Sequence, residues 1–410
     1  MRKSATTGNP FNIIVLVAAL GYFVDIYDLI LFNVVKNASL SALGFTGEEL
    51  ERNGIILFNW QMTGMLIGGI IWGVLGDKKG RVKVLFGSII MYSLANIANG
   101  FVNDITSYAI IRFIAGVGLA GELGAGITLV SETMTKENRG YGTMLIVTFG
   151  ALGAVLAALV ADEFTWRIAY YAGGVMGLVL LALRIGTYES GMFHHLRYSK
   201  AKRGRFSDLF SDYSRLKKYI YCIFIGLPIW YVIGVLIALS NKFGAINNVE
   251  GTIVIGTSIM FAYIGLSAGD LICGIASQLL RSRKKVVMAY LFLTMMLTLI
   301  FLFARNISYF WFNVLCFALG AASGYWALFV TIASEQFGTN LRATVTTTVP
   351  NFVRGAVVPI TLSFKWLEHS LGSITSALVV GMGCTVLAFI AVMNIEETFG
   401  KDLDYYEKTE

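Results

Sequence analysis

The sequence predicts an all-α membrane protein in which twelve transmembrane helices form two pseudo-symmetric six-helix bundles. The composition, the length of the apolar runs and an internal repeat lead to this prediction. Hydrophobic residues make up 56% of the 410 residues and charged residues only 14%, and the mean hydropathy is +0.69. Because a soluble domain has roughly 25% charged residues, we expect this chain to fold in a lipid bilayer.

A helix needs about 20 apolar residues to cross a bilayer, and runs of that length recur along the whole chain. They predict spans at 11–34, 53–76, 84–102, 107–130, 142–161, 167–186, 218–240, 251–279, 286–304, 309–333, 343–364 and 372–394. We therefore expect an N-terminal bundle at 1–186, a central loop at 187–217, a C-terminal bundle at 218–394 and a tail at 395–410.

Basic residues in the short loops predict the orientation, because loops on the cytoplasmic side of a membrane are enriched in Lys and Arg. The loops on the side of both termini hold most of them, among others Lys78, Lys79, Arg81, Lys83, Lys136, Arg139, Arg281, Arg283, Lys284, Lys285 and Arg342. The opposite loops hold Lys36, Arg52, Lys242, Arg305 and Lys365. We expect a multi-pass inner-membrane protein with both termini, the central loop and the tail in the cytoplasm. The net charge of +7 thus predicts topology and no nucleic-acid partner.

An internal repeat relates the two halves. Ser131-Glu132 is followed after six residues by Arg139, and Ser334-Glu335 is followed after six residues by Arg342, at an offset of 203 residues. The loop from Gly73 to Lys83 has a weaker echo in the region of Arg281 and Arg283. Two six-helix halves with a shared signature indicate a duplicated transporter whose site lies between the halves.

Several motifs resemble those of the major facilitator superfamily. Gly73-Val-Leu-Gly-Asp77-Lys78-Lys-Gly80-Arg81-Val-Lys83 resembles its loop between helices 2 and 3. The stretch from Arg112 to Gly124 resembles the fourth helix of its proton-linked branches, and the stretch from Asn351 to Pro359 resembles the eleventh helix of metabolite–proton symporters. Glu189-Ser190 is similar to the start of the central loop in the sugar-porter-like branch.

The first helix carries the finer resemblance. Asp25-Ile26-Tyr27-Asp28 resembles the paired aspartates of aromatic-acid and related organic-acid symporters, although that family has a small residue where Ile26 stands. The second-half loop also departs from the superfamily pattern, because Gln278 stands where the aspartate would be. These resemblances imply the superfamily fold and transport by alternating access.

Buried charges are the candidates for proton coupling, because a carboxylate at bilayer depth costs about 3 kcal/mol and is usually paired or functional. Asp25 and Asp28 lie three residues apart on one helix face. The resemblance to sugar–proton carriers implies that Asp28 carries the proton and that Arg112 is its partner. A permanent ion pair between helices 1 and 4 is the alternative. Glu122 either shares the proton, contacts substrate, or is a packed protonated residue.

Arg354 is the first candidate for contact with an anionic substrate, because it lies mid-helix between Pro350 and Pro359 and an arginine fork matches a carboxylate or phosphate. A structural role is the alternative. Other polar and aromatic residues near the middle of their spans are expected at the substrate site: Tyr27, Gln61, Trp230, Tyr231, Tyr325, Trp326 and Asn351. Asp270 lies about two turns from the cytoplasmic end of its span; we interpret it as structural, and a place in the gate is the alternative.

The repeated loop residues are expected to form a cytoplasmic gate. Asp77 is predicted to accept hydrogen bonds from a neighbouring helix N-terminus and to pair with Arg139. Glu132, Glu335 and Arg342 are predicted to form the matching set in the other half. Gly73, Lys78, Gly80 and Arg81 belong to the same loop motif. The alternative is a set of solvated residues that only determine topology.

These residues predict a proton-coupled symporter that takes up a small organic anion, such as a carboxylate. The alternatives are a facilitator or exporter of another solute (a sugar, a phosphate ester, or a metal chelate) and a membrane sensor without transport. The four cysteines lack metal-ligand spacing, no phosphate-binding loop is present, and no nucleophile–base set can be assembled. We therefore expect no metal, no cofactor and no enzyme activity, and a monomer whose partners are the substrate, protons and lipid.

Overall fold

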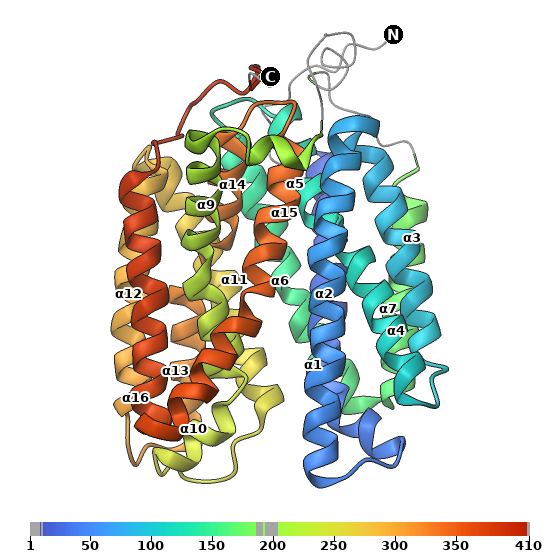
Figure 1. The fold of residues 1–410 in the computed structure, drawn as a ribbon, viewed down its shortest axis with the longest axis vertical. Coiled ribbons are helices and arrows are strands. Elements are labelled where there is room, and N and C mark those ends of the chain that lie inside the picture. The colour runs from blue at the N-terminus through green and yellow to red at the C-terminus, as the bar shows by residue number, and fades with distance from the viewer. Residues whose placement is uncertain (1–8, 10, 186–191, 193–203, 408–410) are drawn as a thin grey trace.

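The computed structural model describes residues 9, 11–185, 192 and 204–407. Glu189-Ser190 and most of the expected central loop therefore lie outside the described residues. The N-terminal half comprises α1 (Ile13–Ala42), α2 (Gly47–Lys79), α3 (Arg81–Asn99), α4 (Ile105–Leu119), α5 (Glu122–Thr133), α6 (Arg139–Glu163) and α7 (Trp166–Leu183). The C-terminal half comprises η1 (Phe206–Leu209), α9 (Tyr213–Tyr231), the π-helical η2 (Val232–Ile237), α10 (Ser240–Ile246), α11 (Ile255–Leu279), α12 (Arg283–Phe303), α13 (Tyr309–Ala322), α14 (Trp326–Gln336), α15 (Arg342–Gly355) and α16 (Val357–Asn394). The two halves stand side by side in Figure 1.

These helices confirm the twelve predicted spans. Eleven helical stretches of the described residues are long and apolar enough to cross a membrane, and the last of them runs from Arg342 to Asn394. That stretch contains two spans, because Gly372 interrupts it with a φ of 73°, a left-handed conformation that only glycine adopts easily. Several helices are longer than the apolar runs that predicted them, since their ends continue into polar residues.

Two spans are broken at corresponding positions. In the fourth span, α4 ends at Leu119 and α5 begins at Glu122. In the tenth span, α13 ends at Ala322, 203 residues after Leu119, and α14 begins at Trp326. The internal repeat of the sequence is thus a repeat of helix geometry. Broken membrane helices expose backbone groups that need hydrogen-bond partners at bilayer depth. Buried acidic side chains can accept hydrogen bonds from the backbone N–H groups at these breaks.

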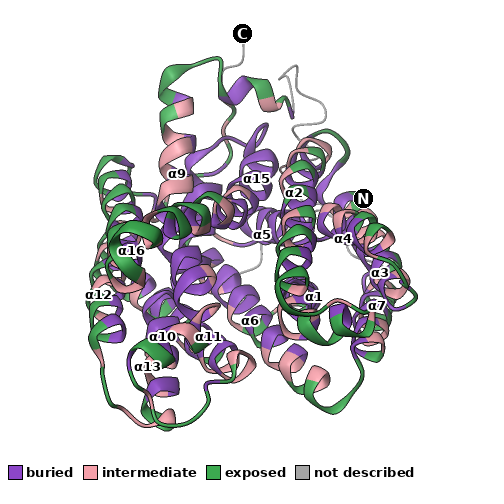
Figure 2. Cartoon of the chain, turned by 60° about the horizontal axis from the view of Figure 1, so that its bottom comes forward, coloured by how far each residue is buried: buried purple, intermediate pink, exposed green. Residues whose placement is uncertain are grey.

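The halves meet along α2 with α15 and along α6 with α11. Gly73 allows the first contact, because a Cβ there would lie 2.9 Å from the Cα of Thr344. Burial is concentrated where helices face one another, and exposed residues lie on the outer faces (Figure 2). Many of the exposed side chains are large and apolar, for example Leu279 at 74% and Trp366 at 79%, as expected for a lipid-facing surface. The described part of the chain begins and ends at one end of the bundle (Figure 1), which we call the terminal side.

Candidate functional site

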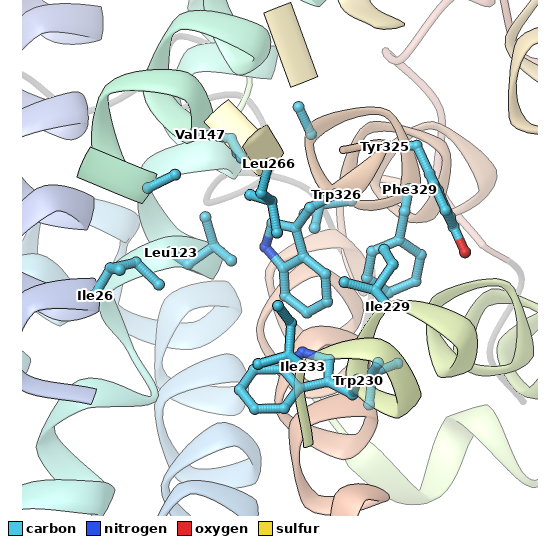
Figure 3. Packing of buried hydrophobic residues seen from close by; sticks show 14 of the residues in the cluster. Ile26, Leu123, Val147, Ile229, Trp230, Ile233, Leu266, Tyr325, Trp326 and Phe329 are labelled. Atoms are coloured by element: carbon cyan, nitrogen blue, oxygen red, sulfur yellow. The ribbon is translucent and has the colours of Figure 1, made fainter. Parts of the chain in front are cut away.

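A small cavity lies between the halves, where α1 and α6 of one half face α9, η2, α11, α14 and α15 of the other. Its described lining is apolar and aromatic except for Arg354 and two tyrosine hydroxyls. The lining residues are Tyr22, Ile26, Val147, Ala151, Ile229, Trp230, Ile233, Tyr263, Leu266, Trp326 and Arg354. Figure 3 shows Trp230 and Trp326 side by side among these aliphatic side chains, with ring centroids 6.4 Å apart.

Arg354 forms an ion pair across the two halves. Its Nη2 lies 3.3 Å from Oδ2 of Asp25 on α1 and 3.4 Å from the hydroxyl oxygen of Tyr22. The guanidinium carbon also lies 5.7 Å from the ring centroid of Trp326. Arg354 is 1% exposed and Asp25 is 0% exposed, yet Nε of the arginine and Oδ1 of the aspartate have no hydrogen-bond partner among the described residues. The cavity wall therefore contains one cation whose donors are only partly used.

A second buried pair lies inside the N-terminal half. Nη1 of Arg112 lies 3.7 Å from Oδ1 of Asp28, and both residues are 0% exposed. The guanidinium lies 5.0 Å from the ring of Phe32 and 5.6 Å from the ring of Tyr170. Among the described residues, neither carboxylate oxygen of Asp28 has a hydrogen-bond partner. The two aspartates three residues apart thus face different arginines, one in each half.

Glu122 has an arginine partner of its own, distinct from the partner of Asp28. It pairs with Arg184 at the end of α7, where Nη1 lies 2.9 Å from Oε2 and Nη2 contacts Oε1. Gly21 of α1 makes room for this pair, because a Cβ there would overlap both side chains. The sequence interpretation missed Arg184. A glutamate at bilayer depth needs a cation, and Arg184 was a visible candidate at the end of the sixth predicted span.

Five of the residues expected at the substrate site contact other groups. Tyr231 donates a hydrogen bond to the Ala377 carbonyl and Tyr325 donates one to the Ile225 carbonyl. Consecutive residues of a helix point about 100° apart, so Trp230 and Trp326 face the cavity while their neighbours do not. The remaining three lie at other helix contacts. The Tyr27 hydroxyl donates a hydrogen bond to the Ala169 carbonyl, and the Asn351 amide donates one to the Ala120 carbonyl. Gln61 is buried beside Gly116.

Tyr22 and Tyr263 are lining residues that the sequence interpretation did not single out. Tyr22 lies three residues before Asp25 and four before Ile26, so the helical period puts it on the same face of α1. This spacing was available in the sequence. Tyr263 has no comparable signal, because its place in the wall depends on how α11 is rotated against α6.

Asp77 closes the terminal side against α15. Its carboxylate accepts hydrogen bonds from the backbone N–H groups of Ala343 and Thr344, at 3.0 and 2.9 Å, in the first turn of that helix. The expected hydrogen bonds to a neighbouring helix N-terminus are therefore present. The expected pair with Arg139 is not, because the arginine nearest to Asp77 is Arg81, at 3.5 Å. Gly80, with a φ of 108°, makes the tight turn between α2 and α3, and Lys78 is exposed.

Each of two buried glutamates binds one arginine from each half. Oε1 of Glu132 lies 2.8 Å from Arg81 and 3.1 Å from Arg342. Oε1 of Glu335 lies 2.7 Å from Arg139 and 3.4 Å from Arg283. The expected matching set was placed within one half, whereas the pairs cross between halves and include Arg283. We call Asp77, Arg81, Glu132, Arg139, Arg283, Glu335 and Arg342 the terminal-side cluster.

The C-terminal segment lies over the terminal-side cluster. The Thr398 hydroxyl donates to Oε2 of Glu335 at 2.6 Å, and the Lys401 carbonyl accepts from Arg139 at 2.7 Å. The Leu403 carbonyl accepts from Arg342 at 2.6 Å. Backbone carbonyls leave no sequence signal of such a role, so the sequence interpretation did not assign these residues to the site. The segment adds neutral acceptors to arginines that already bridge the halves.

Comparison with known proteins agrees with this architecture. Residues 18–360 match the Major Facilitator Superfamily. A probable 4-methylmuconolactone transporter of Cupriavidus pinatubonensis is 29% identical over 216 residues, which is 50% of this chain and 50% of that protein. A niacin transporter of Acinetobacter baylyi is 32% identical over 176 residues (41% of this chain, 38% of that protein), and its benzoate transport protein is 30% identical over 186 residues (42% and 38%). The chain thus spans about half, or less, of the length of these curated relatives.

Solved structures match over nearly the full length. A proton:xylose symporter aligns with a TM-score of 0.76 at 14% identity, covering 96% of this chain and 97% of that chain. The transporter FucP in the outward conformation aligns with a TM-score of 0.76 at 15% identity, covering 95% and 100%. At such identity these matches show the fold alone. The match over residues 18–360 shows that the chain belongs to the Major Facilitator Superfamily, a family of membrane transporters and not of enzymes.

Proposed function

We propose that this transporter couples the uptake of a small organic anion, in particular a carboxylate on an aromatic ring, to the movement of protons. Arg354 is the observation that carries the proposal, because it is the one charged side chain among the described residues that line an otherwise apolar and aromatic cavity. Its guanidinium presents paired N–H donors that match a carboxylate. Trp230 and Trp326 offer ring faces for an aromatic body. Relatives named for niacin and benzoate transport favour the same class.

The coupling between anion uptake and proton movement follows from charge balance at Arg354. The pair of Arg354 and Asp25 is electrically neutral, and both residues are buried. A carboxylate substrate on Arg354 would leave an uncompensated negative charge, which is costly at this depth. Protonation of Asp25 restores neutrality and frees the arginine. In this scheme Asp25 and the substrate compete for one guanidinium, and one proton accompanies each anion. This differs from the expectation that Asp28 is the main carrier, which leaves the Asp28–Arg112 pair as a second site.

Alternating access then requires the terminal side to open. In the proposal this side is cytoplasmic, because the basic loops lie there, and the terminal-side cluster is the gate. Residues 1–186 and 218–394 are the two bundles that rock as a monomer, joined by the loop 187–217 and followed by the tail 395–410. The bundles separate on that side when the ion pairs of Glu132 and Glu335 with the arginines of the opposite half break.

Transport in proteoliposomes tests the proposal, with nicotinate and benzoate as probes. Under an imposed pH gradient the wild type accumulates a probe, whereas Asp25→Asn loses accumulation down to a ratio of about one while exchange of probe across the membrane continues. Arg354→Gln loses binding of both probes. Glu396→Gln, at an exposed surface glutamate, is the matched control and keeps accumulation.

Other outcomes decide against the proposal. Flux that is indifferent to the pH gradient and unchanged in Asp25→Asn indicates a facilitator or exporter. Binding of the probes without any flux indicates a sensor. Unchanged affinity for both probes in Arg354→Gln removes the proposed substrate contact.

A further inference from the structure

Asp270 of α11 is a buried carboxylate that the proposed coupling scheme does not use. It is 0% exposed, and its Oδ1 accepts a hydrogen bond of 2.9 Å from the backbone N–H of Ala327 in the first turn of α14. Its Oδ2 has no hydrogen-bond partner, and no ion pair to it occurs among the described residues. It contacts the start of α14, next to Trp326 of the cavity wall, and forms no ion pair with the terminal-side cluster among the described residues.

Among the described residues, no cation forms an ion pair with Asp270 from the elements packed around it. The titratable groups that interact with it are Tyr22 of α1, Tyr290 of α12 and Cys273 of its own helix, all of which are uncharged near neutral pH. The facing stretches of α6 and η2 are apolar, α13 has no charged residue, and the charged residues of α6 lie at its ends. The basic residues of α12 lie in its first turn, where Arg283 pairs with Glu335. When ionised, Asp270 is therefore stabilised mainly by the N-terminus of α14.

The corresponding break in the other half is built differently. Glu122 occupies the first turn of α5, the second part of that broken span, and is neutralised by Arg184. A buried carboxyl group thus lies at the start of the second segment of each broken span. Glu122 belongs to that segment itself and has an arginine, whereas Asp270 reaches the start of α14 from the neighbouring α11 and has none among the described residues. A carboxylate stays ionised as long as its arginine has no other anion to bind, whereas a carboxylate without a cation can exchange a proton without such a competitor.

We propose that Asp270 is a second proton-binding residue of the transport cycle, which holds α14 while it is ionised and releases the helix when it is protonated. This inference depends on the proposed function. α14 connects the two parts of the mechanism, since it carries Trp326 of the cavity wall at its start and Glu335 of the terminal-side cluster near its end. Midway, the Thr331 hydroxyl lies 2.7 Å from the Thr143 hydroxyl of α6 in the other half. A proton on Asp270 weakens the hydrogen bond to Ala327 and loosens a helix that closes the terminal side.

Infrared spectroscopy of the full-length protein in lipid tests proton binding without any substrate. As the pH is lowered, the wild type gains a carboxylic-acid C=O band, and Asp270→Asn lacks one component of it. Glu122→Gln, the matched control at the arginine-paired carboxylate, retains that component. A band in Asp270→Asn that equals the wild-type band at every pH overturns the proposal. Should the asparagine variant not fold, Asp270→Ser, which keeps a helix-capping side chain, takes its place.

Transport distinguishes this inference from the function on which it depends. With nicotinate and benzoate as probes, Asp270→Asn lowers pH-driven accumulation more than exchange and flattens the pH dependence of exchange. A pH profile identical to that of the wild type overturns the role in the cycle. If the wild type moves neither probe, the proposed function fails, while the infrared result still decides whether Asp270 binds a proton.

Discussion

Replacing Glu132 with glutamine removes the charge of one bridging carboxylate and keeps its shape. Glu132 is 2% exposed, and its Oε1 accepts hydrogen bonds from Arg81 at 2.8 Å and from Arg342 at 3.1 Å. Only the second of these arginines belongs to the other half. In the proposed cycle, the substitution therefore weakens a contact between the halves that is broken when the terminal side opens.

The arginines keep other acceptors, which sets the size of the effect. Arg342 still donates to the Leu403 and Ser334 carbonyls, and Arg81 still donates to the Gly76 carbonyl. Neither cation is left without partners, so the loss is that of a charged hydrogen bond, about 1.5–3 kcal/mol, and not the larger cost of an orphaned buried charge. At 1.4 kcal/mol per factor of ten, the ratio of open to closed terminal side rises about 10- to 150-fold.

Distances between two spin labels measure this ratio. Lys79→Cys at the end of α2 and Leu280→Cys after α11 place labels at exposed positions of the two halves, and the four native cysteines are buried. Glu132→Gln is expected to move population to the longer distance. The matched control is Glu396→Gln, which removes an exposed pair 3.9 Å from Lys401 that is worth little. A shift below about two-fold, or an equal shift in the control, would refute the reasoning.

Three further predictions concern packing and the C-terminal segment. Gly153→Ala places a Cβ on the Phe23 carbonyl oxygen, so unfolding assays should show a loss of about 1–3 kcal/mol, whereas Gly383→Ala, which has open space, should change little. Thr398→Val removes the hydroxyl that donates a hydrogen bond to Glu335. The same spin-label pair should report a larger population with the terminal side open, but a smaller increase than Glu132→Gln produces. Partial burial opposes ionisation of Glu397, but hydrogen bonds from Ser282 and from backbone N–H groups hold its pKa below its ordinary value. The stability that Glu397 adds at the start of α12 is thus fully present above the ordinary glutamate pKa and is lost as the pH falls through the lowered pKa of Glu397. Hydrogen exchange in the first turn of α12, measured against pH, should show this loss. Glu397→Gln should abolish the pH dependence.

Sequence reasoning succeeded where a property depends on local composition. The twelve spans follow from runs of apolar residues, because lipid tolerates few other backbone arrangements. The same reasoning identified Asp25, Asp28, Arg112 and Arg354 as charges that a bilayer would not accept unpaired. It also found Glu132 and Glu335 through their spacing to an arginine at an offset of 203 residues.

The sequence by itself determined which residues need partners, and only the tertiary structure decided which partners they have. Asp25 meets Arg354 across 329 residues of chain, and Glu122 meets Arg184, which the sequence interpretation did not single out. The reason is that each pairing depends on the rotation of two helices about their axes, and neighbouring residues such as Tyr325 and Trp326 differ in direction by about 100°. That rotation is set by close contacts between helices, as at Gly73 and Thr344, and not by the hydropathy of either helix alone.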